Sequence, residues 1–331
     1  MTVAFIVIAA AWAGITFWEK TTRKFEGAEA VWVKIPKGST DNQIEEILKN
    51  SLGTSYGKAV HEVWTTIKGS PERAPGAYLI QPGETGLGIA RRLRANVQTP
   101  IKVTFNNIRL IDQLPSKITK ELQFDDKDFL RACDSILPKA GYDKANYIGV
   151  FIPDSYEFYW TATPETVVNR LLEYHDKFWT KERRDKAAAL GLTPQQVTTL
   201  ASIVDEETAV ADEKGTIARL YLNRLDKGMK LQADPTVKYA VGDFTLRRIL
   251  QKHLEVKSPY NTYQVEGLPP GPIRMPEKST IDAVLNAPQN NYLYMCAKED
   301  FCGRHNFAST LAEHNANSRR YRAALDALGI K

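Results

Sequence analysis

Cysteine is scarce in this chain, with three among 331 residues. So few cysteines exclude a small disulfide-stapled scaffold, which needs several pairs. Cys133 falls in a helix-like apolar pattern and is predicted to be a buried small hydrophobe. Cys296 and Cys302 flank a predicted turn, so either an oxidised pair or two free thiols fit them. His305 follows at Cys-x5-Cys-x2-His, which lacks a fourth ligand, and we predict neither a metal nor another cofactor.

Runs of basic residues are also missing. The formal net charge of +5 is mild for this length, and no Lys/Arg run or glycine-rich basic tract stands out. Nucleic acid is therefore not a predicted partner, whereas a slight positive balance suits an anionic cell-envelope polymer equally well. With 43% hydrophobic and 25% charged residues, the chain is predicted to be globular and is long enough for two domains.

Charge is absent from residues 2–18, which are otherwise aliphatic, aromatic or alanine-rich. A bilayer-spanning helix needs roughly 20 apolar residues, with a range of about 17–25, so we predict a membrane anchor over residues 1–19. A signal peptide and a buried core helix are the alternatives. Lys20, Arg23 and Lys24 follow the segment and no basic residue precedes it. The positive-inside rule, taken alone, would therefore keep the rest of the chain in the cytoplasm.

Residues 30–95 contain a weak internal repeat. Residues 31–35 and 77–80 alternate like short strands, and each is followed by a Pro/Gly turn, a Ser or Thr cap and a helix, near 42–48 and 87–93. The pattern resembles a LysM-type glycan-binding module, whose strand–helix–helix–strand units carry a Gly-x-Thr turn before a helix. A generic α/β unit with ordinary turn chemistry is the alternative.

The remaining chain alternates helical and irregular patterns. Residues 96–150 combine a strand at 101–105 with amphipathic helical stretches and are predicted to be a connecting α/β segment. A long polar helix is predicted over about 164–189, and a Gly/Pro-rich irregular region over 255–276. A C-terminal helix over about 309–328 is predicted to close the fold.

Three consecutive acids lie within an apolar helical segment. Thr193 followed by proline predicts the start of this helix, and no breaker follows before Gly215. At about 100° per residue, Glu206 falls opposite the apolar stripe, where it is predicted to be solvated. Asp205 and Glu207 fall at the two margins of the stripe, and packing at the second margin is predicted to desolvate Glu207 partly.

Partial desolvation would make Glu207, unlike its two acidic neighbours, suited to general-acid catalysis. Burial disfavours the charged form and raises a carboxyl pKa. A raised pKa suits a general acid that must hold its proton near neutral pH. The alternative is a helix-flank glutamate paired with a lysine or arginine.

Further motifs follow this helix in a fixed order: Leu-Gln-Ala-Asp-Pro-Thr-Val at 231–237, Ser-Pro-Tyr-Asn-Thr-Tyr at 258–263, Gly-Leu-Pro-Pro-Gly-Pro-Ile at 267–273 and His-Asn-Phe at 305–307. With Ala-Ser-Ile-Val-x-x-Glu at 201–207, the order resembles the YceG-like (MltG-type) endolytic murein transglycosylases. The resemblance is dense over about 150–315 and looser before that. Glu207 matches the family's catalytic glutamate. Ser155 stands where the family's Pro-Asp-Thr-Tyr segment has threonine.

The resemblance implies an α+β fold with four parts: an N-terminal membrane helix (1–19), a small LysM-like α/β module (30–95), a connecting segment (96–150) and a mixed α/β catalytic domain (151–331) with a helix-borne glutamate. It implies a lyase that cleaves the MurNAc-β-1,4-GlcNAc bond of peptidoglycan, leaves 1,6-anhydro-MurNAc ends and terminates glycan elongation. The implied partners are glycan strands and cell-wall synthases. The implied location is the outer, periplasmic side of the inner membrane.

The supporting residues that we predict are mostly suited to sugar hydroxyl and acetamido groups: Gln232, Asp234, Asn261, Thr262, Tyr263, Glu157 and His305. Tyr263 can stack on a pyranose or only cover core, and His305 can bond Glu207 or only stabilise a loop. Asp234 is the candidate second carboxylate, whose participation would make the protein a lysozyme-like hydrolase. A non-catalytic peptidoglycan-binding scaffold is the alternative outside the enzymes.

Overall fold

The computed structural model describes residues 2–246 and 248–329. Helices alternate with small two-stranded sheets, which confirms the predicted mixture of α and β structure. The chain divides into two compact units; the first comprises residues up to 103 with 118–125 and 155–164, and the second comprises 104–117, 126–154 and residues from 165 onward. The predicted connecting segment, 96–150, is thus shared between both units.

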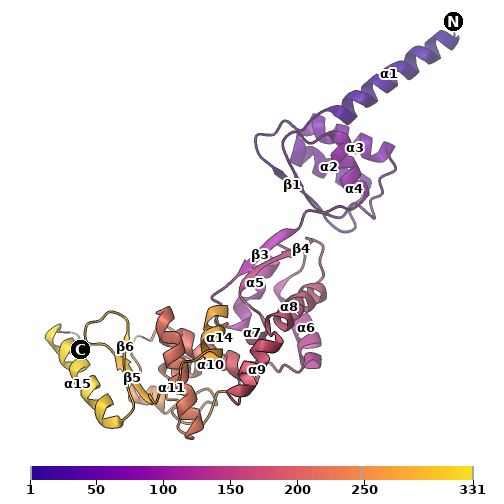
Figure 1. The fold of residues 1–331 in the computed structure, drawn as a ribbon. Helices are drawn as coiled ribbons and strands as arrows, with labels where there is room; N and C mark the ends of the chain where they lie inside the picture. Colours follow the sequence, from indigo (N-terminus) through magenta and orange to yellow (C-terminus); the bar gives the residue numbers. More distant parts are fainter. Residues whose placement is uncertain (1, 247, 330–331) are drawn as a thin grey trace. The chain divides into compact units, whose positions relative to one another are not determined.

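The first unit contains the sheet of β1 (Val31–Ile35) and β2 (Gly76–Ile80) and the helices α1 (Thr2–Thr22), α2 (Asp41–Leu52), α3 (Thr54–Thr66) and α4 (Gly86–Arg94), all labelled in Figure 1 except β2. A second sheet pairs β3 (Ile101–Phe105) with β4 (Asp154–Phe158), and both strands cross the boundary between the two units. β1 pairs antiparallel with β2, with Val33 opposite Tyr78. Both side chains are fully buried, and with Trp64 of α3 they belong to one hydrophobic core.

Turn and cap residues explain where these strands end and the following helices begin. Gly38 and Gly83 have φ of +81° and +84°, a region that favours glycine, and each ends a strand in a tight turn. Thr40 then caps α2 in a capping box with Gln43, and Thr85 caps α4. β1–α2 and β2–α4 therefore both have the predicted order of strand, turn, cap and helix. The likeness to a LysM module and the binding of glycan stay predictions.

α1 differs from the other helices of this unit in its exposure. Ile8, Trp12 and Trp18 are 67–70% exposed, whereas Thr21 and Phe25 are buried and Phe25 joins the core of the module. Across the part of the chain that the structure describes, no helix is long and apolar enough to cross a membrane. The anchor predicted over residues 1–19 is therefore not confirmed.

The second unit is mainly helical. Its elements are α5 (Pro115–Thr119, which ends beyond the unit boundary), α6 (Asp126–Ile136), α7 (Tyr147–Val150), α8 (Pro164–Phe178), α9 (Lys181–Ala189), α10 (Pro194–Glu207), α11 (Lys214–Asp226), α12 (Asp234–Val241), α13 (Gln251–Leu254), α14 (Lys278–Leu285), β5 (Tyr294–Ala297), β6 (His305–Ala308) and α15 (Leu311–Ala327). Short 3₁₀ turns cover 111–113, 137–140 and 211–213. α10 lies at the centre, in contact with α11 and α14, and residues 197–204 are all buried.

Two helices end earlier than the sequence pattern predicts. α10 ends at Glu207 rather than continuing toward Gly215, because Thr208 is extended and its hydroxyl accepts a bond from the Val210 amide at 3.0 Å. The polar helix predicted over 164–189 is two helices, since Thr180 caps the start of α9. The irregular region 255–276 is confirmed, with turns and bends but neither helix nor strand.

All three cysteines are free. Cys133 is fully buried in α6, as predicted, and burial raises the pKa of its thiol to about 12. Cys296 lies in β5 and Cys302 in the exposed turn after it. Of the two alternatives for this pair, the structure therefore has the free thiols.

Candidate active site

Asp205 joins three elements of the scaffold. Its side chain is 3% exposed and pairs with Lys214 of α11, Nζ to Oδ1 at 2.6 Å. Its other oxygen accepts a hydrogen bond from the backbone amide of Glu277, the residue that caps α14, at 2.7 Å. An acid that is buried and paired in this way holds α10, α11 and α14 together and is not available to a substrate.

Glu206 is not solvated, which corrects the prediction from the helical wheel. Its side chain is 17% exposed and pairs with Arg109 at 2.7 Å and with Arg274 at 2.8 Å. Arg109 also lies over the ring of Phe244, with 4.5 Å from its guanidinium carbon to the ring centroid. Residues distant in sequence thus cover the face of α10 that the pattern assigns to solvent.

Glu207 has a neutral partner instead. Its Oε1 accepts a hydrogen bond of 2.6 Å from the hydroxyl of Tyr221 on α11. Within the described residues, no Lys or Arg forms an ion pair with it. Desolvation raises the pKa of Glu207 to about 7; the bond from Tyr221 opposes this rise, and the negative charge of Asp234 adds to it. The predicted desolvation is therefore present, and Glu207 holds a proton through most of the range below neutrality.

A pocket of about 200 Å³ opens at Glu207. The predicted residues Gln232, Asp234, Tyr263 and His305 line it together with Glu207. The other lining residues were not predicted as site residues: Leu220, Tyr221, Arg224, Leu231 and Met295. Of these, Tyr221 and Arg224 lie three positions apart on α11, which places them on one face of that helix.

Asp234 and Tyr263 form a second polar pair in the pocket. The Tyr263 hydroxyl donates to Asp234 Oδ1 at 2.6 Å. Burial and then this bond raise the pKa of the Tyr263 phenol, so the phenol remains a donor. Asp234 begins α12, directly before Pro235. The pocket therefore contains two carboxyl groups, one bonded by each of two tyrosines.

Arg224 holds the pocket wall that carries Gln232. Its guanidinium donates to the carbonyls of Leu293 at 2.6 Å and of Leu231 at 2.9 Å, and to Oε1 of Gln232 at 3.2 Å. Gln232 has φ of +50°, in the left-handed region that a non-glycine residue seldom adopts. Three bonds from this buried cation, to the carbonyls of Lys230 and Leu231 and to the side chain of Gln232, fix the strained turn.

Asn261 and Thr262 do not reach the pocket, although the motif suggested that they bind substrate. Both are 0% exposed. Asn261 donates to the carbonyls of Leu254 and Val256, and Thr262 bonds the amide of Ala233 and the hydroxyl of Thr236. Direct sugar contact does not fit this burial. Both residues instead hold the loop that presents Tyr263.

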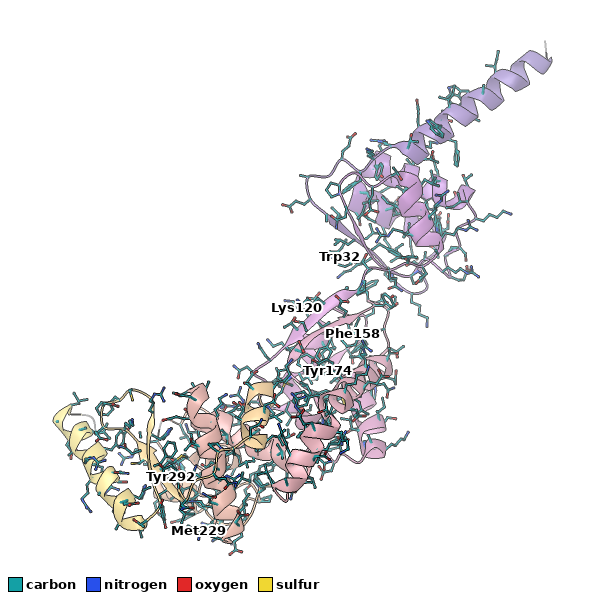
Figure 2. All side chains as sticks on the ribbon, in the orientation of Figure 1. Trp32, Lys120, Phe158, Tyr174, Met229 and Tyr292 are labelled. Carbon is teal, nitrogen blue, oxygen red and sulfur yellow. The ribbon has the colours of Figure 1, made fainter. Side chains whose placement is uncertain are left out.

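His305 and Glu157 also differ from the expected pattern. His305 lines the pocket but pairs with Glu213, Nδ1 to Oε2 at 3.1 Å, rather than with Glu207. Its strand is supported by Tyr292, labelled in Figure 2, whose ring stacks on Phe307 with centroids 5.4 Å apart. Glu157 lies on β4 in the first unit, where it is exposed. It is not among the residues that line the described pocket.

The model of the YceG-like family matches residues 33–320. The chain belongs to the YceG-like family. An endolytic murein transglycosylase of Bacillus subtilis (strain 168) is 28% identical over 311 residues, which cover 87% of this chain and 84% of the relative. One of Streptococcus pneumoniae serotype 2 is 28% identical over 320 residues, covering 87% of this chain but 57% of the relative.

A solved structure extends the family likeness to the fold. The crystal structure of a yceG-like protein from Listeria monocytogenes matches with a TM-score of 0.58 and 27% sequence identity. The match covers 88% of this chain and 99% of the other. The YceG-like fold is therefore common to both chains.

Proposed function

We propose that this YceG-like protein is an endolytic murein transglycosylase that cleaves the MurNAc-β-1,4-GlcNAc bond of peptidoglycan and leaves a 1,6-anhydro-MurNAc end. The observation that carries the proposal is Glu207, a pocket-lining carboxyl with a pKa of about 7 whose hydrogen-bond donor is the neutral Tyr221. The names of the bacillar and streptococcal relatives support the same reaction.

Glu207 serves in both halves of this reaction. Its neutral carboxyl gives a proton to the glycosidic oxygen as the bond from C1 to that oxygen breaks, because a sugar alkoxide leaves poorly. The resulting carboxylate then removes the proton of the muramic O6 hydroxyl as O6 bonds to C1. The proton returns to Glu207, no water is consumed, and no second carboxyl is required.

Tyr221 orients the acid. Because its hydroxyl donates to Oε1 at 2.6 Å, Oε1 acts as an acceptor and the acidic proton resides on Oε2. Burial keeps the pKa of Tyr221 well above its ordinary value, so the phenol cannot take the proton in place of the substrate. Tyr221 is therefore a positioning residue for Glu207.

A lysozyme-like hydrolase is the second candidate, because Asp234 lines the same pocket. A hydrolase needs a second carboxylate as nucleophile or as base for water. Mass spectrometry of the products from purified sacculi separates the candidates. Anhydro ends support the proposal, new reducing ends indicate the hydrolase, and the absence of cleavage indicates a binding scaffold.

We also propose that the enzyme is located at the outer side of the cell membrane. There it would act near the cell-wall synthases and end the elongation of glycan strands. The exposed Trp12 and Trp18 of α1 support contact with a bilayer. A variant without residues 1–17 tests this, since it keeps the buried Thr21 and Phe25. We expect it to fold with an unchanged melting temperature and to lose sedimentation with membranes; sedimentation equal to that of the full chain would refute the anchor.

A further inference from the structure

A second pocket lies in the same unit as Glu207 and has no part in the site described above. It measures about 660 Å³ and is formed by the segment that joins α6 to α7. Its lining includes Asp134, Tyr142, Asp143, Lys144 and Tyr147. An open depression of this size with several convergent polar groups is a candidate binding site.

The lining combines ring faces with hydrogen-bonding groups. The Tyr142 hydroxyl lies 3.4 Å from Nδ1 of the buried His175, and the two rings pack edge to face with centroids 5.5 Å apart. Tyr142 is only partly buried and lines the pocket. Asp134 and Lys144 pair at 3.2 Å while their side chains stay 49% and 78% exposed. An amphipathic aromatic ring beside exposed donors and acceptors suits a sugar, which has an apolar ring face and a rim of hydroxyl groups.

α10 links this pocket to the catalytic glutamate. Gln195, in the first turn of α10, donates to the carbonyl of Gly141 at the pocket, with 3.4 Å from Nε2 to the oxygen. Glu207 ends the same helix. At 1.5 Å of rise per residue, the two ends are about 18 Å apart along the helix. This span between the two α10 residues is several times the length of one sugar ring.

The loop over 255–276 lines the catalytic pocket and contacts the turn that carries the second pocket. Its Tyr263 lines the catalytic pocket, while its Pro270 accepts a hydrogen bond from Asn146 at 3.2 Å. At Gly271 a β-carbon would clash with the carbonyl oxygen of Ala145, so the loop and the 143–146 turn are in direct backbone contact. Asn146 and Ala145 lie between Lys144 and Tyr147, which line the second pocket, so one loop joins the wall of the catalytic pocket to the turn beside the second pocket.

We propose that the pocket at Tyr142 is a distal subsite that binds a sugar unit of the same glycan strand whose scissile bond lies at Glu207. This inference rests on the proposed function. A strand bound at both pockets must extend several rings beyond the cut, so the subsite favours cleavage within long strands over cleavage near their ends.

The test compares two lengths of substrate and two kinds of variant. Tyr142→Ala removes the ring, and the double variant Asp134→Ala/Lys144→Ala removes the exposed polar pair without a change of net charge. The matched control is Lys181→Ala/Asp185→Ala, which removes an exposed ion pair of 2.6 Å on α9, outside both pockets. Each protein is assayed on long uncrosslinked glycan strands and on a tetrasaccharide, which extends only two rings from a central cut.

We expect both pocket variants to lose up to about tenfold in cleavage rate on long strands, with the tetrasaccharide rate and the control unchanged. Retention of the wild-type length preference by both folded pocket variants would overturn the subsite. A failure of the proposed reaction shows itself separately, as a wild-type enzyme that cuts neither substrate. Binding of long strands to the Glu207→Gln protein, with and without Tyr142→Ala, then still decides whether the pocket holds glycan.

Discussion

The last turn of α10 has a scaffold side and a pocket side, and its three consecutive acids differ because of this. On the scaffold side, Asp205 and Glu206 are paired with Lys214, Arg109 and Arg274. On the pocket side, Glu207 has only the hydroxyl of Tyr221, and its pKa rises to about 7. Desolvation in a pocket without a cationic partner leaves Glu207 able to carry a proton. The contrast predicts that substitutions on the scaffold side lower the stability of the fold, whereas substitutions on the pocket side lower the rate of cleavage.

Glu207→Gln should have the largest effect, and this effect is on the reaction. Glutamine keeps the shape and accepts the bond from Tyr221 but has no proton to transfer. Loss of general acid–base catalysis removes about 10²–10⁴-fold in rate, and more where one group serves both steps. The measurement is release of anhydromuropeptides from sacculi at equal folded concentration, with Glu206→Gln as the control. Near-wild-type release by Glu207→Gln would contradict the assignment of Glu207 as the catalytic acid.

Asp205→Asn should instead act on stability. The substitution leaves the ammonium group of Lys214, whose side chain is 13% exposed, without its counter-charge. Breaking a buried ion pair costs about 3–5 kcal/mol. Urea unfolding should therefore show a lower midpoint, while the folded fraction keeps its cleavage rate. An unchanged unfolding midpoint together with a loss of cleavage would show that Asp205 acts in the reaction rather than in the stability of the fold.

The raised pKa of Glu207 should also appear in the pH dependence of stability. A carboxyl whose pKa is higher in the folded state, about 7 against an ordinary value of 4.5, contributes stability that is complete below the unfolded pKa. That contribution is lost as pH rises from about 4.5 to 7, in total about 3 kcal/mol at 1.36 kcal/mol per unit. Glu207→Gln should remove this slope, so the variant should be the more stable protein above neutral pH. Parallel stability curves for the two proteins between pH 4 and 8 would contradict the assignment.

Tyr221→Phe should have the smallest effect, and it tests whether the Tyr221 hydroxyl sets the pKa and the orientation of Glu207. Without the phenol the bond that lowers the pKa of Glu207 is lost, so the pKa should rise and the alkaline limb of the rate profile should move to higher pH. The rate at the optimum should fall modestly, because Glu207 keeps its proton but loses its orientation. The check is the pH–rate profile of kcat. A uniform fall in rate with an unmoved limb would reduce Tyr221 to a packing role.

Part of the site could be predicted because its cause is local. The apolar stripe of α10 places Glu207 at a desolvated margin, and the motif order brings Gln232, Asp234 and Tyr263 to it. Glu206 was placed wrongly because a helical wheel cannot show that Arg109 and Arg274, both far away in sequence, cover the polar face.

Other features of the site depend on tertiary contacts or on backbone details that the pattern does not contain. Tyr221 was missed because it meets Glu207 only through the packing of α11 against α10. Asn261 and Thr262 have the polarity of ligand-binding residues, and their residue types do not reveal that they bond the protein's own backbone. The end of α10 depends on one side-chain bond at Thr208 that competes with helix continuation.

The end of α10 at Glu207 has an electrical consequence. Aligned peptide dipoles place roughly half a negative charge at the C-terminus of a helix, worth about 0.3–1 kcal/mol to a nearby charge. If the helix continued toward Gly215, this end would lie elsewhere. Where it is, the field opposes ionisation of Glu207 and favours the positive charge that develops at C1 in an oxocarbenium-like transition state. The backbone itself thus supports both the acid and the sugar cation that the acid creates.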